Sequence, residues 1–316
     1  MPSAPLKPVV FGLSGPQLTP EERAFFAEHN PLGFILFARN IQNLDQVARL
    51  CAELRMAVNN PQAFIFIDQE GGRVQRIKEP LLPNYPSMRE LVSQARGDEG
   101  FIAAHFKKLG TDLSKLGINV DCAPVLDVPI PGSHDVIGDR AFGVHADDII
   151  KYAAAAVKGL NQAKIFPVIK HIPGHGRAMV DSHLELPIVD THLDELRKTD
   201  FAPFKALNDA PFAMTAHVVY RAIDPHLCAT LSPKVIALIR HEIGFQGLLL
   251  TDDLGMKALK GDFAGLAHAS LEAGCDIVLH CSGKMEEMLQ VAKGLPTSLS
   301  PLTQARLAKL GLSSYK

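Results

Sequence analysis

Eight short runs of apolar, β-prone residues recur along the chain, and they constrain its fold more than any other feature. Within each run the apolar residues are continuous instead of alternating with polar residues, which is typical of parallel strands buried on both faces. The runs cover residues 9–13, 33–37, 64–67, 118–122, 166–169, 212–216, 247–250 and 276–279.

Segments with the apolar spacing of helices separate most of these runs. They cover residues 44–58, 99–116, 147–163, 193–207, 233–243, 263–273 and 285–291, and a last helix is expected at 302–310. Ser232-Pro233 is typical of an N-cap followed by proline at the first helical position. Gly110, Gly117 and Gly244 are expected where helices end.

Strands that alternate with helices in this way predict an α/β fold, a (β/α)8 barrel of the TIM type. A doubly wound open sheet is the alternative, but no GxGxxG follows the first strand, which disfavours its nucleotide-binding form. The sequence contains no linker, low-complexity tract or repeat, so we expect one domain over residues 1–316.

Charge and composition argue against several classes of partner. A net charge of −2 leaves no basic surface of the kind that binds nucleic acid. The sequence has no run of about 18 apolar residues, so no membrane span is predicted. The N-terminus lacks the pattern of a signal peptide. The five cysteines are scattered with no CxxC pair, which disfavours disulfides and structural zinc. We expect a cytoplasmic monomer.

One stretch concentrates titratable side chains after the fifth apolar run. It comprises Lys170-His171-Ile172-Pro173-Gly174-His175-Gly176 and, after a short loop, Asp181-Ser182-His183. The stretch begins where a buried strand ends and continues into a glycine- and proline-rich loop. Its polar groups therefore favour a functional role over a packing role.

Polar side chains also follow the other strands of the predicted barrel. The carboxyl ends of barrel strands meet at one rim, where active sites lie, so we expect these side chains to converge. They are the segment 68–76 after the third strand, Asp121 and Asp127 at the fourth, His217 at the sixth, Asp252 and Asp253 at the seventh, and His280 at the eighth.

A rim rich in Asp, Arg, Lys and His suits a small substrate with many hydroxyls, such as a sugar. A retaining glycosidase needs a carboxylate nucleophile and an acid/base group. Asp252 is the best nucleophile candidate, because it ends a hydrophobic strand. Asp253 is expected on the other side of the backbone, as a helix N-cap or a support. The usual pairing of two carboxylates would match Asp252 with Glu70 or Asp68.

Four motifs resemble those of glycoside hydrolase family 3, and specifically its bacterial β-N-acetylglucosaminidases of peptidoglycan recycling. Residues 170–176 with Asp181-Ser182-His183 resemble KHFPGHG and DSH, and residues 68–76 resemble DQEGGRVQR. Residues 139–143 resemble the arginine-bearing RAFG stretch, and residues 251–256 resemble SDDLSM. The chain departs from these patterns at Ile172, Arg177, Thr251 and Gly255, and the carboxylates are untouched.

The resemblance implies a barrel enzyme without metal or cofactor that works by double displacement. It matches Asp252 to the nucleophile, and His183, paired with Asp181, to an unusual acid/base. The residues that match the positions binding N-acetylglucosamine in the −1 subsite are Asp68, Arg76, Arg140, Lys170 and His171. The implied substrates are GlcNAc β-glycosides, above all GlcNAc-1,6-anhydroMurNAc muropeptides. We expect no second α/β sandwich domain, which supplies the acid/base residue in some members.

Histidine suits proton transfer at neutral pH, because its unperturbed pKa is about 6.5. Asp181 could bond one ring nitrogen of His183, which fixes the tautomer and favours the protonated form. We expect the loop 174–182 to be a lid that carries His183 into and out of the site. Lys170 is expected to donate to sugar hydroxyls, and Arg73 to hold the turn at 68–70 by ion pairing.

Three other interpretations stay open. A phosphorylase on the same scaffold is one, because a histidine acid/base repels an incoming phosphate less than a carboxylate does. A non-catalytic sugar binder is the second, disfavoured by the nucleophile beside an acid/base pair. A metal-dependent amidohydrolase is the third, with zinc on His171, His175 and His183. Pro173-Gly174 separate the first two histidines, so they do not share a helix face as in HExxH.

Overall fold

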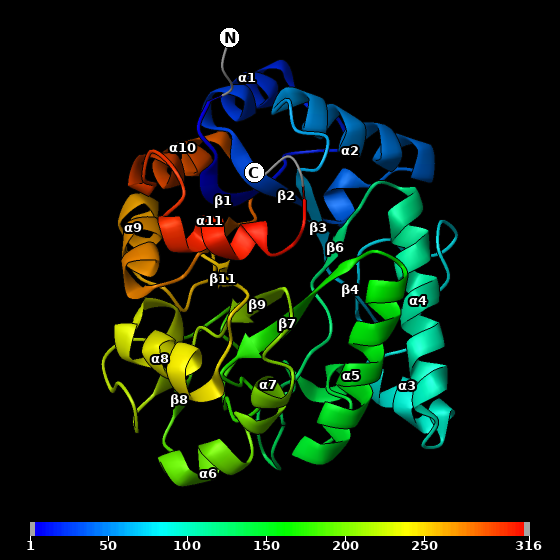
Figure 1. The fold of residues 1–316 in the computed structure, drawn as a ribbon, viewed down its shortest axis with the longest axis vertical. Helices are drawn as coiled ribbons and strands as arrows, with labels where there is room; N and C mark the ends of the chain where they lie inside the picture. Colours follow the sequence, from blue (N-terminus) through cyan, green and yellow to red (C-terminus); the bar gives the residue numbers. More distant parts are fainter. Residues whose placement is uncertain (1–3, 313–316) are drawn as a thin grey trace.

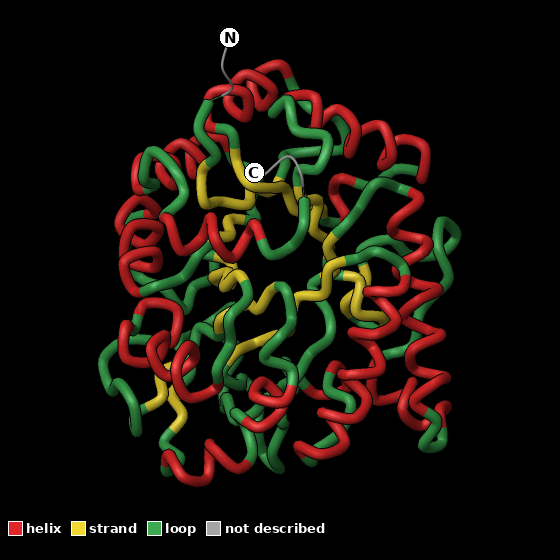
Figure 2. The backbone as a smooth tube through the Cα atoms, in the orientation of Figure 1, coloured by secondary structure: helices red, strands yellow, loops and turns green. Residues whose placement is uncertain are grey.

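The computed structural model describes residues 4–312 and shows a closed barrel of parallel strands surrounded by helices (Figure 1). Neighbouring strands follow chain order, and β1 pairs with β12 to close the ring (Figure 2). The barrel strands are β1 (Lys7–Gly12), β2 (Pro31–Leu36), β3 (Phe64–Ile67), β6 (Val120–Asp121), β7 (Phe166–Ile172), β9 (Phe212–Thr215), β11 (Leu248–Asp253) and β12 (Ile277–His280). The predicted (β/α)8 barrel is confirmed, and the open sheet is not formed.

Each barrel strand packs on both faces, which explains why its apolar run is continuous. In β3, Phe64 and Phe66 belong to the interior of the barrel, whereas Ile65 and Ile67 pack with the surrounding helices. Inside, Phe64, Phe66 and Phe212 meet edge to face, with ring centroids 5.2–6.1 Å apart. All eight predicted runs form barrel strands, with shifts only at their ends.

The outer layer consists of α-helices connected to the strands by loops. They are α1 (Pro20–His29), α2 (Leu44–Ala57), α3 (Met88–Ala95), α4 (Glu99–Lys115), α5 (Ala146–Gln162), α6 (Leu193–Lys198), α7 (Ala202–Ala206), α8 (Pro233–Leu238), α9 (Phe263–Ala273), α10 (Met285–Gly294) and α11 (Pro301–Ala308). The sequence patterns do not predict α1 and α3. The signal for α1 was present, because Thr19 and Glu22 form a capping box at its start.

Two predicted helices differ in the structure. The segment 193–207 splits into α6 and α7, because the chain between them turns to bury the Asp200 carboxylate, which accepts from Arg177. The segment 233–243 starts as α8, with Ser232 as its N-cap as predicted. It continues as a π-helical turn over Ile239–Ile243 and ends at Gly244 in the left-handed conformation.

The predicted helix end at Gly110 is wrong, because this residue lies inside α4. A Cβ at Gly110 would lie 2.8 Å from the Cβ of Ala163, and one at Gly159 would lie 2.3 Å from the carbonyl oxygen of Ala103. These glycines let α4 and α5 approach each other closely. A glycine that the sequence pattern predicts at a helix end thus serves close helix packing in the structure.

Helix α11 closes the amino-terminal end of the barrel. Asp276, which directly precedes β12, accepts hydrogen bonds from Thr303 and Arg306 of α11 and from Arg240. Leu307 joins the apolar cluster of the barrel interior. The opposite, carboxyl-terminal end is therefore the one left for a ligand.

Two small sheets lie in the loops after the barrel strands. The hairpin of β4 (Gln69–Gly71) and β5 (Val74–Gln75) follows β3, and β8 (Ile188–Val189) pairs with β10 (Val219–Tyr220). Among residues 4–312, no helix is long and apolar enough to cross a membrane.

Candidate active site

A cavity of about 360 Å³ opens among the loops that follow the barrel strands. It gathers seven of the eight predicted site residues, which come from β7 and β11 and from the loops after β3, β6 and β7. The seven are Asp68, Arg76, Arg140, Lys170, His171, His183 and Asp252. The eighth, Asp181, contacts the ring of His183. Residues far apart in sequence thus line one hollow large enough for a monosaccharide.

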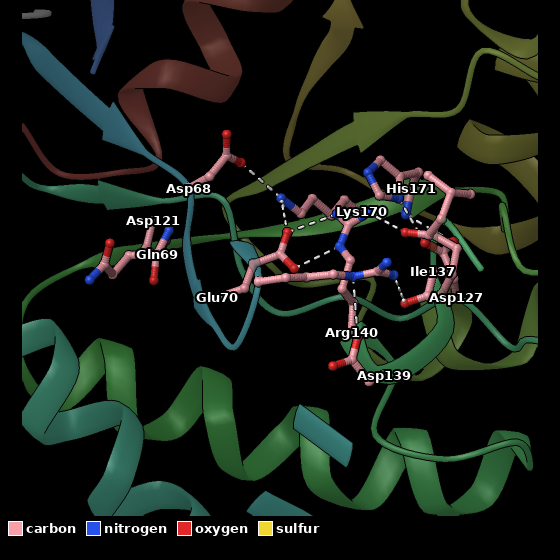
Figure 3. A network of polar contacts seen from close by, with 12 residues as sticks. Asp68, Gln69, Glu70, Asp121, Asp127, Ile137, Asp139, Arg140, Lys170 and His171 are labelled. Atoms are coloured by element: carbon pink, nitrogen blue, oxygen red, sulfur yellow. Dashed lines mark hydrogen bonds and ion pairs between the residues drawn. The ribbon is translucent and has the colours of Figure 1, made fainter. Parts of the chain in front are cut away.

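One wall of the cavity is a network of alternating charges (Figure 3). Lys170 lies between two carboxylates, with its Nζ 2.9 Å from Asp68 Oδ1 and 2.6 Å from Glu70 Oε1. Arg140 binds Glu70 through two hydrogen bonds of 2.8 Å, and Arg76 binds the second oxygen of Asp68 at 2.8 Å. This network holds each cation in one orientation at the edge of the cavity.

The charges in this network are mutually stabilised. Burial alone would raise the pKa of Asp68, but Lys170 and Arg76 outweigh it and lower that pKa strongly. Burial alone would lower the pKa of Lys170, but Asp68 and Glu70 outweigh it and raise that pKa. Lys170 is therefore a protonated hydrogen-bond donor at neutral pH, which disfavours a Schiff base and suits the predicted contact with sugar hydroxyls.

Beneath the cavity, Asp127 orients His171 at the end of β7 and His175 in the loop that follows. Its Oδ2 accepts from Nδ1 of His171 at 2.7 Å, and its Oδ1 accepts from the backbone N–H groups of His171 and His175. The ionised carboxylate can only accept, so Nδ1 of His171 carries the proton and Nε2 remains for a ligand. Burial opposes ionisation, yet contacts with His171 and His175 lower the pKa of Asp127.

Asp252 lies near the end of β11 and is partly buried at the cavity. Its Oδ1 accepts from the backbone N–H of Asp253 at 2.8 Å. Burial alone would raise the pKa of Asp252, but the nearby His217 and His171 outweigh it and lower that pKa. The carboxylate is therefore ionised at neutral pH, and the backbone N–H of the next residue orients it.

Asp253 supports the strand end, one of the two roles expected for it. The expectation that it lies away from the site is wrong, because Asp253 lines the cavity beside Asp252. Oδ1 of Asp253 accepts from the N–H groups of Gly255 and Cys281, at 3.0 Å each. It does not cap the next helix, since the N-cap of α9 is Asp262. Asp253 thus ties the loop after β11 to the end of β12.

Asp181 and His183 form a close pair on the loop after β7. Oδ1 of Asp181 accepts from Nδ1 of His183 at 2.8 Å and from its backbone N–H at 2.9 Å. Burial opposes ionisation of Asp181, but these hydrogen bonds outweigh it and lower its pKa. The His183 side chain is 63% exposed. Its Nδ1 is held by the carboxylate, so Nε2 is the ring nitrogen available to a ligand.

Several predicted residues lie elsewhere than expected. Asp121, His217 and His280 are fully buried and do not line the cavity. His217 Nε2 donates to the carbonyl oxygen of Asp253, so it supports the end of β11 from below. Arg73 does not hold the turn at 68–70, because it pairs with Asp135 and Asp139 of the loop after β6.

The sequence analysis assigns neither Glu70 nor Phe37 to the site, although the usual rule of two carboxylates would pair Glu70 with Asp252. Glu70 is buried between Lys170 and Arg140, so it cannot partner Asp252 as an acid. Glu70 lies within the motif at residues 68–76, and this was the sequence signal that could have placed it at the site. Phe37 lines the cavity, with the guanidinium groups of Arg39 and Arg76 each 4.9 Å from its ring centroid. No sequence pattern pointed to this stacking.

The histidines do not assemble as a metal centre. Throughout residues 4–312, no group of three or more His, Cys, Asp or Glu side chains is arranged to hold a metal ion. His171 instead bonds Asp127, and His183 bonds Asp181. The five cysteines are buried and free.

Comparisons with known proteins agree with this geometry. A family model, the glycosyl hydrolase family 3 N-terminal domain, matches residues 8–309. The chain is 39% identical to a beta-hexosaminidase of Alkalilimnicola ehrlichii, over 96% of this chain and 88% of that protein. It is 34% identical to a beta-hexosaminidase of Haemophilus influenzae, over 96% and 87%.

Solved structures with the same fold include two relevant enzymes. One is NagZ from Neisseria gonorrhoeae in complex with N-trifluoroacetyl-D-glucosamine, with a TM-score of 0.89 and 34% identity over 98% of this chain and 91% of that one. The other is a glycoside hydrolase family 3 beta-N-acetylglucosaminidase from Paenibacillus sp., with a TM-score of 0.87 and 32% identity over 96% and 60%. With nearly its whole length matched by the family model, the chain belongs to glycosyl hydrolase family 3.

Proposed function

We propose that this chain is a retaining exo-β-N-acetylglucosaminidase with Asp252 as nucleophile and a His183/Asp181 acid/base pair. One observation carries the proposal. An ionised carboxylate on a rigid strand end lines the same cavity as a histidine whose Nδ1 is held by a second carboxylate. The names of the relatives, beta-hexosaminidase and beta-N-acetylglucosaminidase, support the same activity.

In the first step, a carboxylate oxygen of Asp252 attacks the anomeric carbon as the glycosidic bond breaks. Nε2 of protonated His183 donates its proton to the departing oxygen, so the aglycone leaves as an alcohol. The sugar is then an ester of Asp252. Asp181 stabilises the imidazolium before the transfer, because its carboxylate accepts from Nδ1.

In the second step, neutral His183 takes a proton from water, and the water oxygen attacks the anomeric carbon. The bond to Asp252 breaks and the carboxylate is restored. Two displacements retain the β-configuration. Asp68, Arg76, Arg140, Lys170 and His171 are proposed to bind the hydroxyls and acetamido group of the sugar. The ion pairs that hold their charged groups in place support this role.

We propose GlcNAc-1,6-anhydroMurNAc muropeptides as the substrates, hydrolysed in the cytoplasm during cell-wall recycling. The motifs at 68–76 and 170–183 and the similarity to NagZ support this substrate class. The relatives described above are named as hydrolases, so phosphorolysis is not proposed. Assays with and without phosphate, with detection of sugar-1-phosphate, separate the two reactions.

The test uses an activated aryl N-acetyl-β-glucosaminide. Asp252→Ala should lower kcat/KM by about 10³-fold or more and abolish a trapped covalent sugar in the mass spectrum. Asp253→Asn is the control variant, and it should still form the covalent glycosyl-enzyme. Near-normal turnover by Asp252→Ala would show that the nucleophile assignment is wrong.

The acid role of His183 has its own test. Acid assistance matters most for poor leaving groups, so His183→Ala should lower kcat/KM on a phenyl glycoside by roughly 10²-fold. On a 2,4-dinitrophenyl glycoside the loss should be far smaller. Equal losses on both substrates would exclude the acid role.

A further inference from the structure

A buried hydrogen bond connects the two ends of the loop that carries His183. Nε2 of His175 and Oγ of Ser182 are 3.0 Å apart, and both residues are only 3% exposed. The bond spans seven positions and closes the loop immediately before His183. Neither partner is explained by the displacement chemistry itself.

His175 is the fixed end of this bond. Its backbone N–H donates to Asp127 at 2.6 Å, and the same carboxylate holds His171 at the end of β7. Its Nδ1 is buried and has no hydrogen-bond partner among the described residues. Among residues 4–312, the bond to Ser182 is therefore the hydrogen bond that orients the imidazole ring, which also packs edge to face on the ring of His171.

Ser182 is held from a second side as well. Its carbonyl oxygen accepts from the backbone N–H of Ala258 at 3.2 Å. Ala258 lies in the loop after β11, six positions beyond Asp252. Ser182 thus bridges the segment that carries the proposed acid/base and the segment that carries the proposed nucleophile.

We propose that His175 and Ser182 are positioning residues that place His183 against the leaving-group oxygen over Asp252. His183 is largely exposed, and within residues 4–312 its ring bonds only Asp181 of the same loop. The pair therefore needs another contact to fix its position relative to Asp252. The bond between His175 and Ser182 transmits the rigid position of β7 to the residue directly before His183. This inference rests on the proposed function.

The experiment measures kcat/KM on phenyl and 2,4-dinitrophenyl N-acetyl-β-glucosaminides, since kcat/KM reports the step in which the leaving group departs. Ser182→Ala removes only the hydroxyl. It should lower kcat/KM about tenfold on the phenyl substrate and less than about twofold on the dinitrophenyl substrate. Ser182→Thr, which keeps the hydroxyl, should recover most of the loss.

A double variant separates positioning from general damage. If Ser182 acts through His183, Ser182→Ala should add almost nothing to His183→Ala on the phenyl substrate. Ser133→Ala is the matched control. Ser133 lies in the loop after β6, and its hydroxyl bonds the carbonyl oxygen of Ile130 in the same loop. This variant should behave as the wild type on both substrates.

Each outcome has one meaning. If His183→Ala depends on the leaving group but Ser182→Ala lowers both rates equally, or adds fully to His183→Ala, the positioning role is overturned alone. If His183→Ala itself shows no dependence on the leaving group, the proposed acid role is overturned, and the positioning role with it.

Discussion

Glu70 and Arg140 are joined by two parallel hydrogen bonds of 2.8 Å, although 70 positions separate them in sequence. Arg140 follows β6, whereas Glu70 follows β3, so the pair ties two loops of the rim together. Glu70 is 1% exposed and also contacts Lys170. A buried carboxylate thus holds two cations of the candidate sugar site.

Replacement of Glu70 should damage stability and binding together. Glu70→Gln leaves the charges of Lys170 and Arg140 less compensated, so the free energy of unfolding should fall by about 3 kcal/mol. Urea unfolding measures this loss, and calorimetric titration with N-acetylglucosamine should show weaker binding. Glu242→Gln breaks an exposed pair with Arg197 and should change neither quantity appreciably. Unchanged binding in Glu70→Gln would contradict the role of the network.

Asp181 should orient the ring of His183 for proton transfer. Asp181→Asn keeps the size of the side chain, but it replaces the charged acceptor of the His183 Nδ1–H with a neutral amide. It should therefore lower kcat/KM on a phenyl glycoside by about tenfold and on a 2,4-dinitrophenyl glycoside far less. Asp190→Asn, which breaks an exposed pair with Arg221, is the control. Equal losses on both substrates would mean that Asp181 only shapes the loop.

His175 should make the protein less stable in acid. Burial, with help from the neighbouring His171, lowers the pKa of His175 to about 4. Below pH ~6.5 the unfolded chain binds a proton at this histidine that the folded chain does not, so stability falls as the pH drops to about 4. The full effect is on the order of 3 kcal/mol.

His175→Gln removes this titration. Urea unfolding at pH 7 and pH 4.5 should show a smaller loss of stability on acidification for the variant than for the wild type. The comparison uses the difference between the two pH values, so any change in stability at pH 7 cancels. Parallel losses in both proteins would mean that His175 is not held neutral.

The contact between α4 and α5 should not tolerate added volume. A Cβ at Gly159 would lie 2.3 Å from a backbone oxygen, so Gly159→Ala should lower the free energy of unfolding by about 1–3 kcal/mol. Gly265 lies in α9 with only ordinary contacts, and Gly265→Ala should raise stability by up to about 1 kcal/mol. A thermal unfolding series measures both. Equal gains at the two sites would contradict the close helix contact.

Chelation should leave activity unchanged. His171 and His183 each bond a carboxylate, and the proposed displacement needs no Lewis acid. Incubation with EDTA, followed by an assay on the aryl substrate, measures the effect. Activity that disappears with EDTA and returns with zinc would favour the metal-dependent alternative.

Much of the fold could be read from the chain because strands buried on two faces leave a continuous apolar signal. All eight runs became barrel strands. The failures lie where a long-range contact overrides a local pattern. The pattern predicts a helix end at Gly110, but this glycine lies inside α4, where its small size lets α5 approach. The segment 193–207 breaks where the buried Asp200 accepts a hydrogen bond from Arg177. Such contacts have no local signature.

The sequence by itself determined the barrel through strand order and periodicity, and its resemblance to family motifs predicted seven of the residues that line the cavity. Only the tertiary structure decided how each one is held. It placed Glu70 between Lys170 and Arg140, set Asp127 beneath His171 and His175, and joined His175 to Ser182. The physical reason is that a hydrogen bond depends on a few tenths of an ångström between atoms brought together by packing, which spacing along the chain does not encode.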